Sequence, residues 1–181
     1  MDKRKLTIIL LAAIGVSLFI WIQFFEVKNQ IRLSQEKLQQ DPETHDFAKV
    51  VSFEKIYMGD ASNLNGLFNA LPLNEYKGTI EMDSDMFSLI VNYKTPVVEI
   101  EEKAKQAVIY NATAAFTLID NLDTVELKFE DKSYTVTRDY VEKWFGTTLI
   151  DFKEPAIFKE KVQNHLKEDI DILVMAYTEG E

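Results

Sequence analysis

The chain has 181 residues, no cysteine and a formal net charge of −10. The lack of cysteine excludes disulfides, thiolate metal sites and a cysteine nucleophile. Three basic residues and one acidic residue precede residue 6, so the rest of the chain carries a net charge of about −12, which repels nucleic acid and anionic lipid.

Residues 6–25 (LTIILLAAIGVSLFIWIQFF) are twenty residues without a charge. At about 1.5 Å per residue, such a helix spans the hydrocarbon core of roughly 30 Å. Lys3, Arg4 and Lys5 precede it and favour a cytoplasmic N-terminus. The residues at the end of this run are bulky and contain no A-x-A cleavage pattern. This favours an uncleaved signal-anchor over a cleaved signal peptide. We therefore expect a cytoplasmic tail (residues 1–5), a single span in the cell membrane and an extracytoplasmic C-terminal domain.

Residues 26–41 contain helix formers and no breaker before Pro42, which predicts a helical stalk that continues the membrane helix. Four side chains fall near heptad spacing, but two heptads that include a serine leave the oligomeric state open. Asp41 and Pro42 suit the start of a further helix. Residues 42–181 are then long enough to form one domain with its own core.

The stretch YMGDASNLNGLFNALPLN (residues 57–74) contains a clear helix start. Asp60 or Ser62 can accept hydrogen bonds from the free N–H groups of the first turn. An apolar stripe then follows at i, i+3, i+4 and i+7, and Pro72 ends the helix. The stripe consists of Leu64, Leu67, Phe68 and Leu71.

Residues 78–94 predict a β-hairpin with a polar turn at DSD, because apolar and polar side chains alternate on both arms. We expect Phe87, Leu89, Val91 and Tyr93 to share one face. Thr95 and Pro96 then open a long helix whose first turn is acidic. Its stripe of small and apolar residues, on which Asn111 falls, suits close packing on a sheet; it comprises Ala104, Val108, Ala115, Ile119 and Leu122.

A second hairpin is predicted around the EDKS turn, with Val125, Leu127 and Phe129 on one face. Asp139 and Glu142 resemble a capping box for a short helix that Gly146 stops. A last helix begins near Pro155. Residues 168–177 are apolar enough for helix or strand, and we favour helix slightly. Hairpins separated by helices predict an α+β fold, with an antiparallel sheet packed against helices.

Three segments, YMGDASN (57–63), VIYNATAAFTLIDNL (108–122) and YTVTRDYVEKWFG (134–146), resemble the landmarks of the bacterial domain of unknown function 4825. Ala61 stands where that family often has Asn, and Ala112 where it often has Ser. The resemblance implies membrane-anchored, extracytoplasmic proteins of Gram-positive bacteria, and no particular reaction. Some relatives carry such a domain on sensor-like membrane proteins, which favours a sensing or interaction role.

Catalytic and metal-binding patterns are sparse. His45 and His165 are the only histidines, and both are expected at the surface; no nucleophile-elbow, S-x-x-K or H-E-x-x-H motif occurs. The acidic EMDSD turn lacks the Gly and the final carboxylate of an EF-hand loop, so a solvated turn is favoured over calcium. We expect no metal and no cofactor.

Two polar residues fall at positions expected to be buried. Asn111 needs hydrogen-bond partners, for which the backbone of residues 57–60 or a strand of the second hairpin is available. Arg138 continues the alternation of Tyr134 and Val136, whose side chains are expected to face the core. A buried arginine needs a carboxylate partner, for which Asp60 or Asp120 is available. Trp144 and Phe145 are expected in the core.

We therefore expect a non-enzymatic, membrane-anchored module that senses or binds a partner in the membrane or at the cell surface, and that binds no nucleic acid. An envelope-associated interaction scaffold is the alternative, and a hydrolase that uses Asp60, Asp83 or Asp120 is a third reading. The expected network or ligand pocket, where Asp60 and Asn63 tie their loop to the long helix and Arg138, comprises Tyr57, Gly59, Asp60, Asn63, Asn111, Asp120, Asn121 and Arg138.

Overall fold

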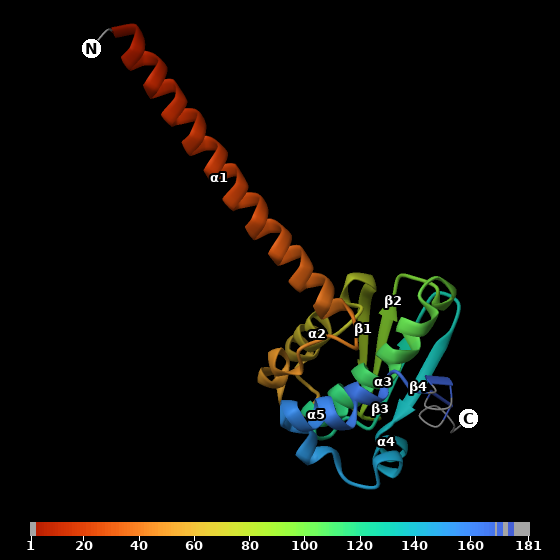
Figure 1. Ribbon diagram of the computed structural model, residues 1–181. Coiled ribbons are helices and arrows are strands. Elements are labelled where there is room, and N and C mark those ends of the chain that lie inside the picture. The colour runs from red at the N-terminus through yellow and green to blue at the C-terminus, as the bar shows by residue number, and fades with distance from the viewer. Residues whose placement is uncertain (1–2, 169, 172–173, 176–181) are drawn as a thin grey trace. The chain divides into compact units, whose positions relative to one another are not determined.

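The computed structural model describes residues 3–168, 170–171 and 174–175 (Figure 1). The chain divides into two compact units, Met1–Leu38 and Gln39–Glu181. The first unit is helical, and the second contains the sheet and the hydrophobic core.

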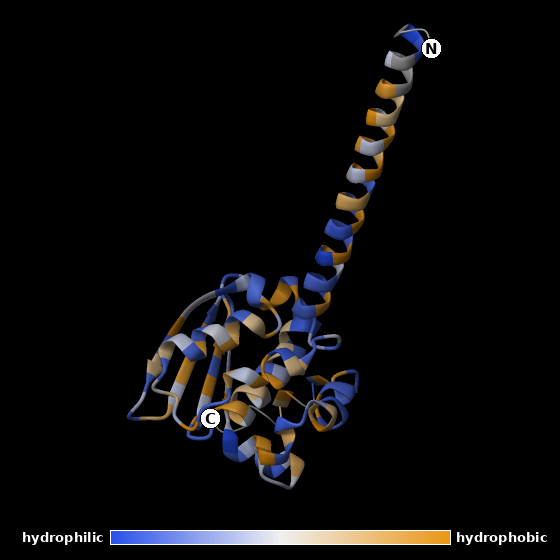
Figure 2. Cartoon of the chain, turned by 90° about the vertical axis from the view of Figure 1, so that its left-hand side faces the viewer, coloured by the Kyte–Doolittle hydropathy of each residue, from blue (hydrophilic) through white to orange (hydrophobic). Residues whose placement is uncertain are grey.

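Helix α1, Lys3–Gln40, continues without a break from the predicted span through the predicted stalk. Within the described residues it is the one helix long and apolar enough to cross a membrane. Its large apolar side chains from Leu10 to Leu38 are exposed. Figure 2 shows hydrophobic residues dominating its N-terminal half and polar residues increasing towards Gln40.

The second unit begins with tight turns instead of the helix expected at Asp41 and Pro42. The Asp41 carboxylate accepts a hydrogen bond from the Glu43 N–H, and its carbonyl accepts from Thr44 and His45, so the aspartate closes a turn. Short 3₁₀ helices, Phe47–Lys49 and Val51–Phe53, lead to helix α2, Ala61–Ala70. Its apolar stripe is buried, as its spacing predicted.

Four strands form one sheet in the order β1-β2-β3-β4. They are β1 (Lys77–Asp83), β2 (Ser88–Tyr93), β3 (Thr124–Lys128) and β4 (Ser133–Thr137). Both predicted hairpins are present, β1 with β2 and β3 with β4. The class is α+β as predicted, and the sheet is mixed: both predicted hairpins pair antiparallel, while β2 and β3, which join them, pair in parallel.

Helix α3, Glu101–Leu118, makes the crossover between these two parallel strands (Figure 1). A helix that returns the chain to the starting edge of β2 forces β3 to run in the same direction. A short 3₁₀ helix, Val97–Glu99, delays its start past Pro96. From Gln106 to Leu118 every side chain of α3 is buried, because the sheet covers one side and the other segments of the unit cover the rest.

After β4 the chain forms α4 (Arg138–Phe145), a 3₁₀ helix (Leu149–Lys153) and α5 (Pro155–Lys161). Gly146 ends α4 with a left-handed φ of 66°, as expected of glycine at this position. The α4 cap is Thr137 and not Asp139, because the Thr137 hydroxyl accepts the hydrogen bond from the Tyr140 N–H. Of the predicted segment 168–177, Ile170, Asp171, Val174 and Met175 are helical, Glu168 lies in a bend, and 169, 172–173 and 176–177 lie outside the described residues.

Two aromatic residues lie at the surface against expectation: Phe87, which was expected on the strand face with Leu89, and Trp144, which was expected in the core. Phe87 is 42 % exposed because it belongs to the turn between β1 and β2, with a φ of 48°, and not to the strand face that buries Leu89. Trp144 is 45 % exposed on α4. Its neighbour Phe145 is partly buried against the core, where its ring lies 4.9 Å from that of Phe152.

Candidate functional site

The three segments that carry the family resemblance meet where α3 ends. We call this region, with the loops bonded to it, the α3 C-terminal end. The loop before α2 is attached there by backbone hydrogen bonds. The Lys55 N–H donates to the Leu118 carbonyl (2.8 Å), while the Asp120 N–H donates to the Lys55 carbonyl and the Asn121 N–H to the Ile56 carbonyl. Lys55 and Ile119 form an isolated parallel bridge.

Met58 and Asn121 fix the position of this loop. The Asn121 side-chain oxygen accepts a hydrogen bond from the Met58 N–H at 2.7 Å. The Met58 side chain is buried in the core, with 1 % of its surface exposed. Backbone bonds on one side and a buried side chain on the other hold residues 55–58 in place, so the two residues between these anchors are presented by a fixed backbone.

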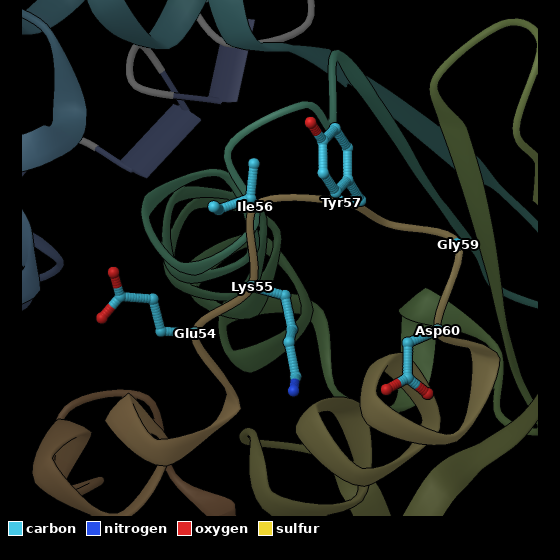
Figure 3. Close-up of a pocket in the computed structure, with 6 residues that line it drawn as sticks. All are labelled: Glu54, Lys55, Ile56, Tyr57, Gly59 and Asp60. Carbon is cyan, nitrogen blue, oxygen red and sulfur yellow. The ribbon is translucent and has the colours of Figure 1, made fainter.

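Ile56 and Tyr57 occupy that position and point outward. Ile56 is 63 % exposed and Tyr57 is 72 % exposed. Figure 3 shows both side chains extending to one side of the loop and the side chains of Lys55 and Asp60 to the other. They line an open hollow of about 660 Å³ together with Glu54, Lys55, Gly59 and Asp60.

Gly59 leaves this hollow open. A Cβ at this position would meet no atom within 4 Å, and the backbone φ is not in the left-handed region. Neither packing nor conformation therefore requires glycine here. A larger side chain at this position would stand in the hollow itself, which makes Gly59 a place where the surface can be changed without disturbing the fold.

Asp60 and Asn63 are engaged in local structure. The Asp60 carboxylate accepts the hydrogen bond of the Asn63 N–H at 3.0 Å and so caps α2, as predicted. The Asn63 side-chain amide donates to the Phe53 carbonyl at 2.7 Å. The expectation that these two residues bind the loop to α3 and to Arg138 is wrong, because Asn121 and the backbone of Lys55 make the contacts with the end of α3.

Arg138 is the first residue of α4, and its guanidinium lies over the end of α3. It donates to the carbonyl oxygens of Phe116 (2.9 Å), Ile119 (2.7 Å) and Leu122 (3.0 Å). The partners predicted from the sequence, Asp60 and Asp120, are wrong. The last carbonyls of a helix lack intrahelical donors and carry partial negative charge, so they bind a cation without any carboxylate. Asp123 and Glu142 add longer ion pairs, at 4.0 and 3.7 Å.

Asn111 is fully buried, as its position on the stripe predicted. Its side-chain amide donates to the Pro72 carbonyl (3.0 Å) and to the Tyr93 hydroxyl (3.2 Å). The partners expected in residues 57–60 or the second hairpin are therefore wrong, because α3 turns this face towards the end of α2 and towards β2. Burial raises the pKa of the Tyr93 hydroxyl well above its ordinary value. Asn111 thus belongs to the core, away from the loop that presents Tyr57.

Asp120 forms a surface ion pair. Its carboxylate lies 3.1 Å from the Lys153 ammonium, which also contacts Glu54 at 2.9 Å. Hydrogen bonds to Glu54 and then to Asp120 raise the pKa of Lys153. This pair ties the 3₁₀ helix Leu149–Lys153 to the hollow and to the end of α3.

His45 is buried, contrary to its predicted place at the surface, with 2 % of its surface exposed. The Ala70 carbonyl, at 2.9 Å from Nε2, can only accept, so Nε2 carries the proton and Nδ1 accepts from the Tyr110 hydroxyl at 2.7 Å. Burial lowers the His45 pKa to about 4. The signal available in the sequence was weak, since a histidine within the polar run DPETHD gives no periodicity that predicts burial. His165 is half-exposed beside Glu168, as expected.

Within the described part of the chain, no group of three or more His, Asp or Glu side chains converges as metal ligands do. In the acidic hairpin turn, the Asp83 carboxylate accepts hydrogen bonds from the N–H groups of Asp85 and Met86 and so stabilises the turn itself. At the α3 C-terminal end, most of the polar residues predicted as a site are thus bonded within the fold, while Ile56 and Tyr57 are exposed.

A protein-family model matches part of the chain. Residues 50–139 match the model of a domain of unknown function, DUF4825. The match covers the loop with Tyr57, all of α2, α3 and the sheet, and ends one residue after Arg138. No curated protein and no solved structure matches the chain.

Proposed function

Because the chain belongs to the DUF4825 family through its residues 50–139, a family without an assigned activity, we propose a function from the geometry: a membrane-anchored, non-catalytic binding module. The observation that carries the proposal is the fixed loop that presents Ile56 and Tyr57 to solvent. Fixed apolar and aromatic side chains bind partners with little loss of conformational entropy.

The polar residues of the region support binding rather than bond-breaking chemistry. Asp60 caps a helix, Asn121 holds Met58, and Arg138 binds helix carbonyls. Each of these groups makes at least one hydrogen bond within the fold. Ile56 and Tyr57 stand exposed on an open hollow that charged side chains also line, and an apolar centre with a polar rim is typical of a contact surface for a partner.

The anchor supplies the location. An uncharged run of twenty residues after Lys3, Arg4 and Lys5 favours an uncleaved span with the N-terminus in the cytoplasm. The second unit then lies outside the cytoplasm of a Gram-positive bacterium, where an acidic domain without cysteine is stable through its core alone. In this arrangement the module senses or binds a partner at the cell surface.

The chain has no native cysteine, so topology is tested with single cysteines and a membrane-impermeant maleimide. Val98→Cys, on a side chain 76 % exposed in the second unit, is expected to be labelled in intact cells. Lys5→Cys, the matched control in the tail, is expected to be labelled only after lysis. The reverse pattern, or loss of an N-terminal tag from the mature chain, would overturn the location.

Binding is tested in intact cells with a photo-crosslinking residue at position 57, and with the same residue at Val98 as the control. A discrete adduct from position 57 that is absent from position 98 supports a specific partner surface. Equal adducts from both positions, or none from position 57, would show that Tyr57 is not part of a binding surface.

A further inference from the structure

The exposed apolar residues of the second unit gather at the α3 C-terminal end. Six of the eight large apolar side chains that are exposed among its described residues lie on segments attached there. The other two are Val98, near the start of α3, and Met175. The six are Ile56, Tyr57, Met86, Phe87, Trp144 and Ile150.

Hydrogen bonds and ion pairs hold these segments to residues 116–124. The Phe87 carbonyl accepts from the N–H groups of Asp123 and Thr124, which places the turn between β1 and β2 beside the start of β3. The hydrogen bond from Arg138 to the Ile119 carbonyl holds the start of α4 at this end. The bond from Lys153 to Asp120 holds the 3₁₀ helix that contains Ile150. The apolar side chains therefore belong to one end of the domain and not to scattered surface positions.

Acidic side chains outnumber basic ones on the segments that carry these apolar residues. These segments, residues 54–60, 83–87, 119–123, 138–145 and 149–153, carry nine carboxylates and four cationic side chains. Two of those cations are half-buried and already bonded, Arg138 to helix carbonyls and Lys153 to Glu54 and Asp120. With nine carboxylates against four cations, the charge of these segments is net negative even when the ion pairs are counted on both sides.

We propose that the α3 C-terminal end docks a cationic amphipathic polypeptide segment, in which apolar side chains contact Ile56 and Tyr57 and basic side chains contact the carboxylates of these segments. This inference rests on the proposed binding function and names the chemistry of its partner. A cationic segment is proposed because its charge is complementary to the negative charge of this surface. An anionic lipid surface, an anionic polymer and a second copy of this acidic chain each present the wrong sign of charge.

The test uses the purified full chain in nanodiscs of zwitterionic lipid, with empty discs as the blank. The probes are a synthetic amphipathic peptide of leucine and lysine and the same peptide with glutamate in place of lysine. The lysine peptide is expected to bind with an affinity that falls as salt is raised, and the glutamate peptide at least about tenfold more weakly. A photo-crosslinking residue at position 57 should capture the lysine peptide, and one at position 98 should not.

Two sets of variants identify the surface. Ile56→Ser with Tyr57→Ser should weaken binding at least about tenfold, while Val98→Ser leaves it unchanged. A side chain at Gly59 disturbs no packing. Gly59→Lys should therefore weaken binding of the lysine peptide, and Gly59→Glu should not. All of these positions are exposed, and unchanged urea unfolding confirms that each variant is folded.

The proposal would be overturned if the two peptides bound equally, if they were captured equally from positions 57 and 98, or if the lysine peptide did not bind up to about 1 mM. It would also be overturned if the protein bound anionic vesicles more tightly than the lysine peptide, or if position 57 cross-linked two copies of the chain. None of these outcomes depends on which side of the membrane the domain occupies. A failure here is therefore distinguishable from a failure of the topology test.

Discussion

Individual residues show where sequence reasoning succeeds in this protein. Asp60 caps α2 and Gly146 ends α4, because each role depends only on the backbone within a few residues. His45, Asn111 and Arg138 are different. His45 bonds Ala70 and Tyr110, and Asn111 bonds Pro72 and Tyr93. Arg138 bonds carbonyls at the end of α3. All of these partners are at least 16 residues away in the sequence. Such contacts depend on how elements pack, which a local pattern does not contain.

His45 makes the stability of the second unit depend on pH. Its folded pKa of about 4 lies below the ordinary value of 6.5. As the pH falls below 6.5, His45 is protonated in the unfolded chain but stays neutral in the folded chain until about pH 4. The free energy of unfolding therefore decreases between pH 6.5 and 4. The loss attributable to this residue approaches about 3 kcal/mol.

The measurement is urea unfolding at several pH values, with Trp144 fluorescence in a Trp21→Phe background. The His45→Gln variant should show a flatter decline between pH 6.5 and 4, whereas His165→Gln, which alters a half-exposed side chain, should decline as the parent does. An identical decline for His45→Gln and the parent would contradict the assignment.

The elements were largely predictable, while the relation between them was not. Alternation located both hairpins and helical spacing located α2 and α3, because each pattern reports which face of a single element is buried. The parallel pairing of β2 with β3 follows from the crossover through α3, which the order of elements implied but the hairpin patterns did not show.

Arg138 binds the end of α3 from outside the helix, since its guanidinium donates to the carbonyl of Phe116 in the last helical turn and to those of Ile119 and Leu122 just beyond it. Arg138→Ala should lower the free energy of unfolding by about 2–4 kcal/mol, because buried carbonyl oxygens lose a charged donor. Arg138→Lys should recover only part of this loss, since an ammonium lacks the planar fork.

Lys161→Ala is the control for this prediction. Its ion pair with Glu160 is largely exposed, so the change should cost less than about 0.5 kcal/mol. Denaturant titration of the three variants gives the comparison. Equal stabilities of Arg138→Ala and Lys161→Ala would show that α3 does not depend on the guanidinium.

At the scale of the whole molecule, the boundary between the two compact units falls within the residue range of α1. The sequence places the start of the folded domain at residue 42, whereas the second compact unit begins at Gln39. Gln40 accounts for the difference. Its carbonyl accepts from the Leu73 N–H (3.1 Å), and its side chain bonds Asn74 (2.6 Å) and the Glu75 N–H (3.2 Å). An amphipathic stalk pattern does not reveal such contacts.

A fragment of residues 39–181 should therefore unfold cooperatively in water without the membrane helix. A fragment of residues 41–181, which lacks the three Gln40 hydrogen bonds, should be less stable by about 1–3 kcal/mol. Circular dichroism during urea titration measures both. A broad, non-cooperative transition for the longer fragment would mean that the second unit needs the first to fold.

The position of Arg138 also has a consequence for the order in which the chain is made. The carbonyls that it binds belong to residues 16 to 22 positions earlier, so α3 emerges from the ribosome before its final donor exists. Strand β2 likewise waits for β3, its parallel neighbour, to be synthesised. A nascent chain that stops before residue 138 therefore lacks the donor for these carbonyls, and the end of α3 can complete its hydrogen bonds only after the last of the three landmark segments has been made.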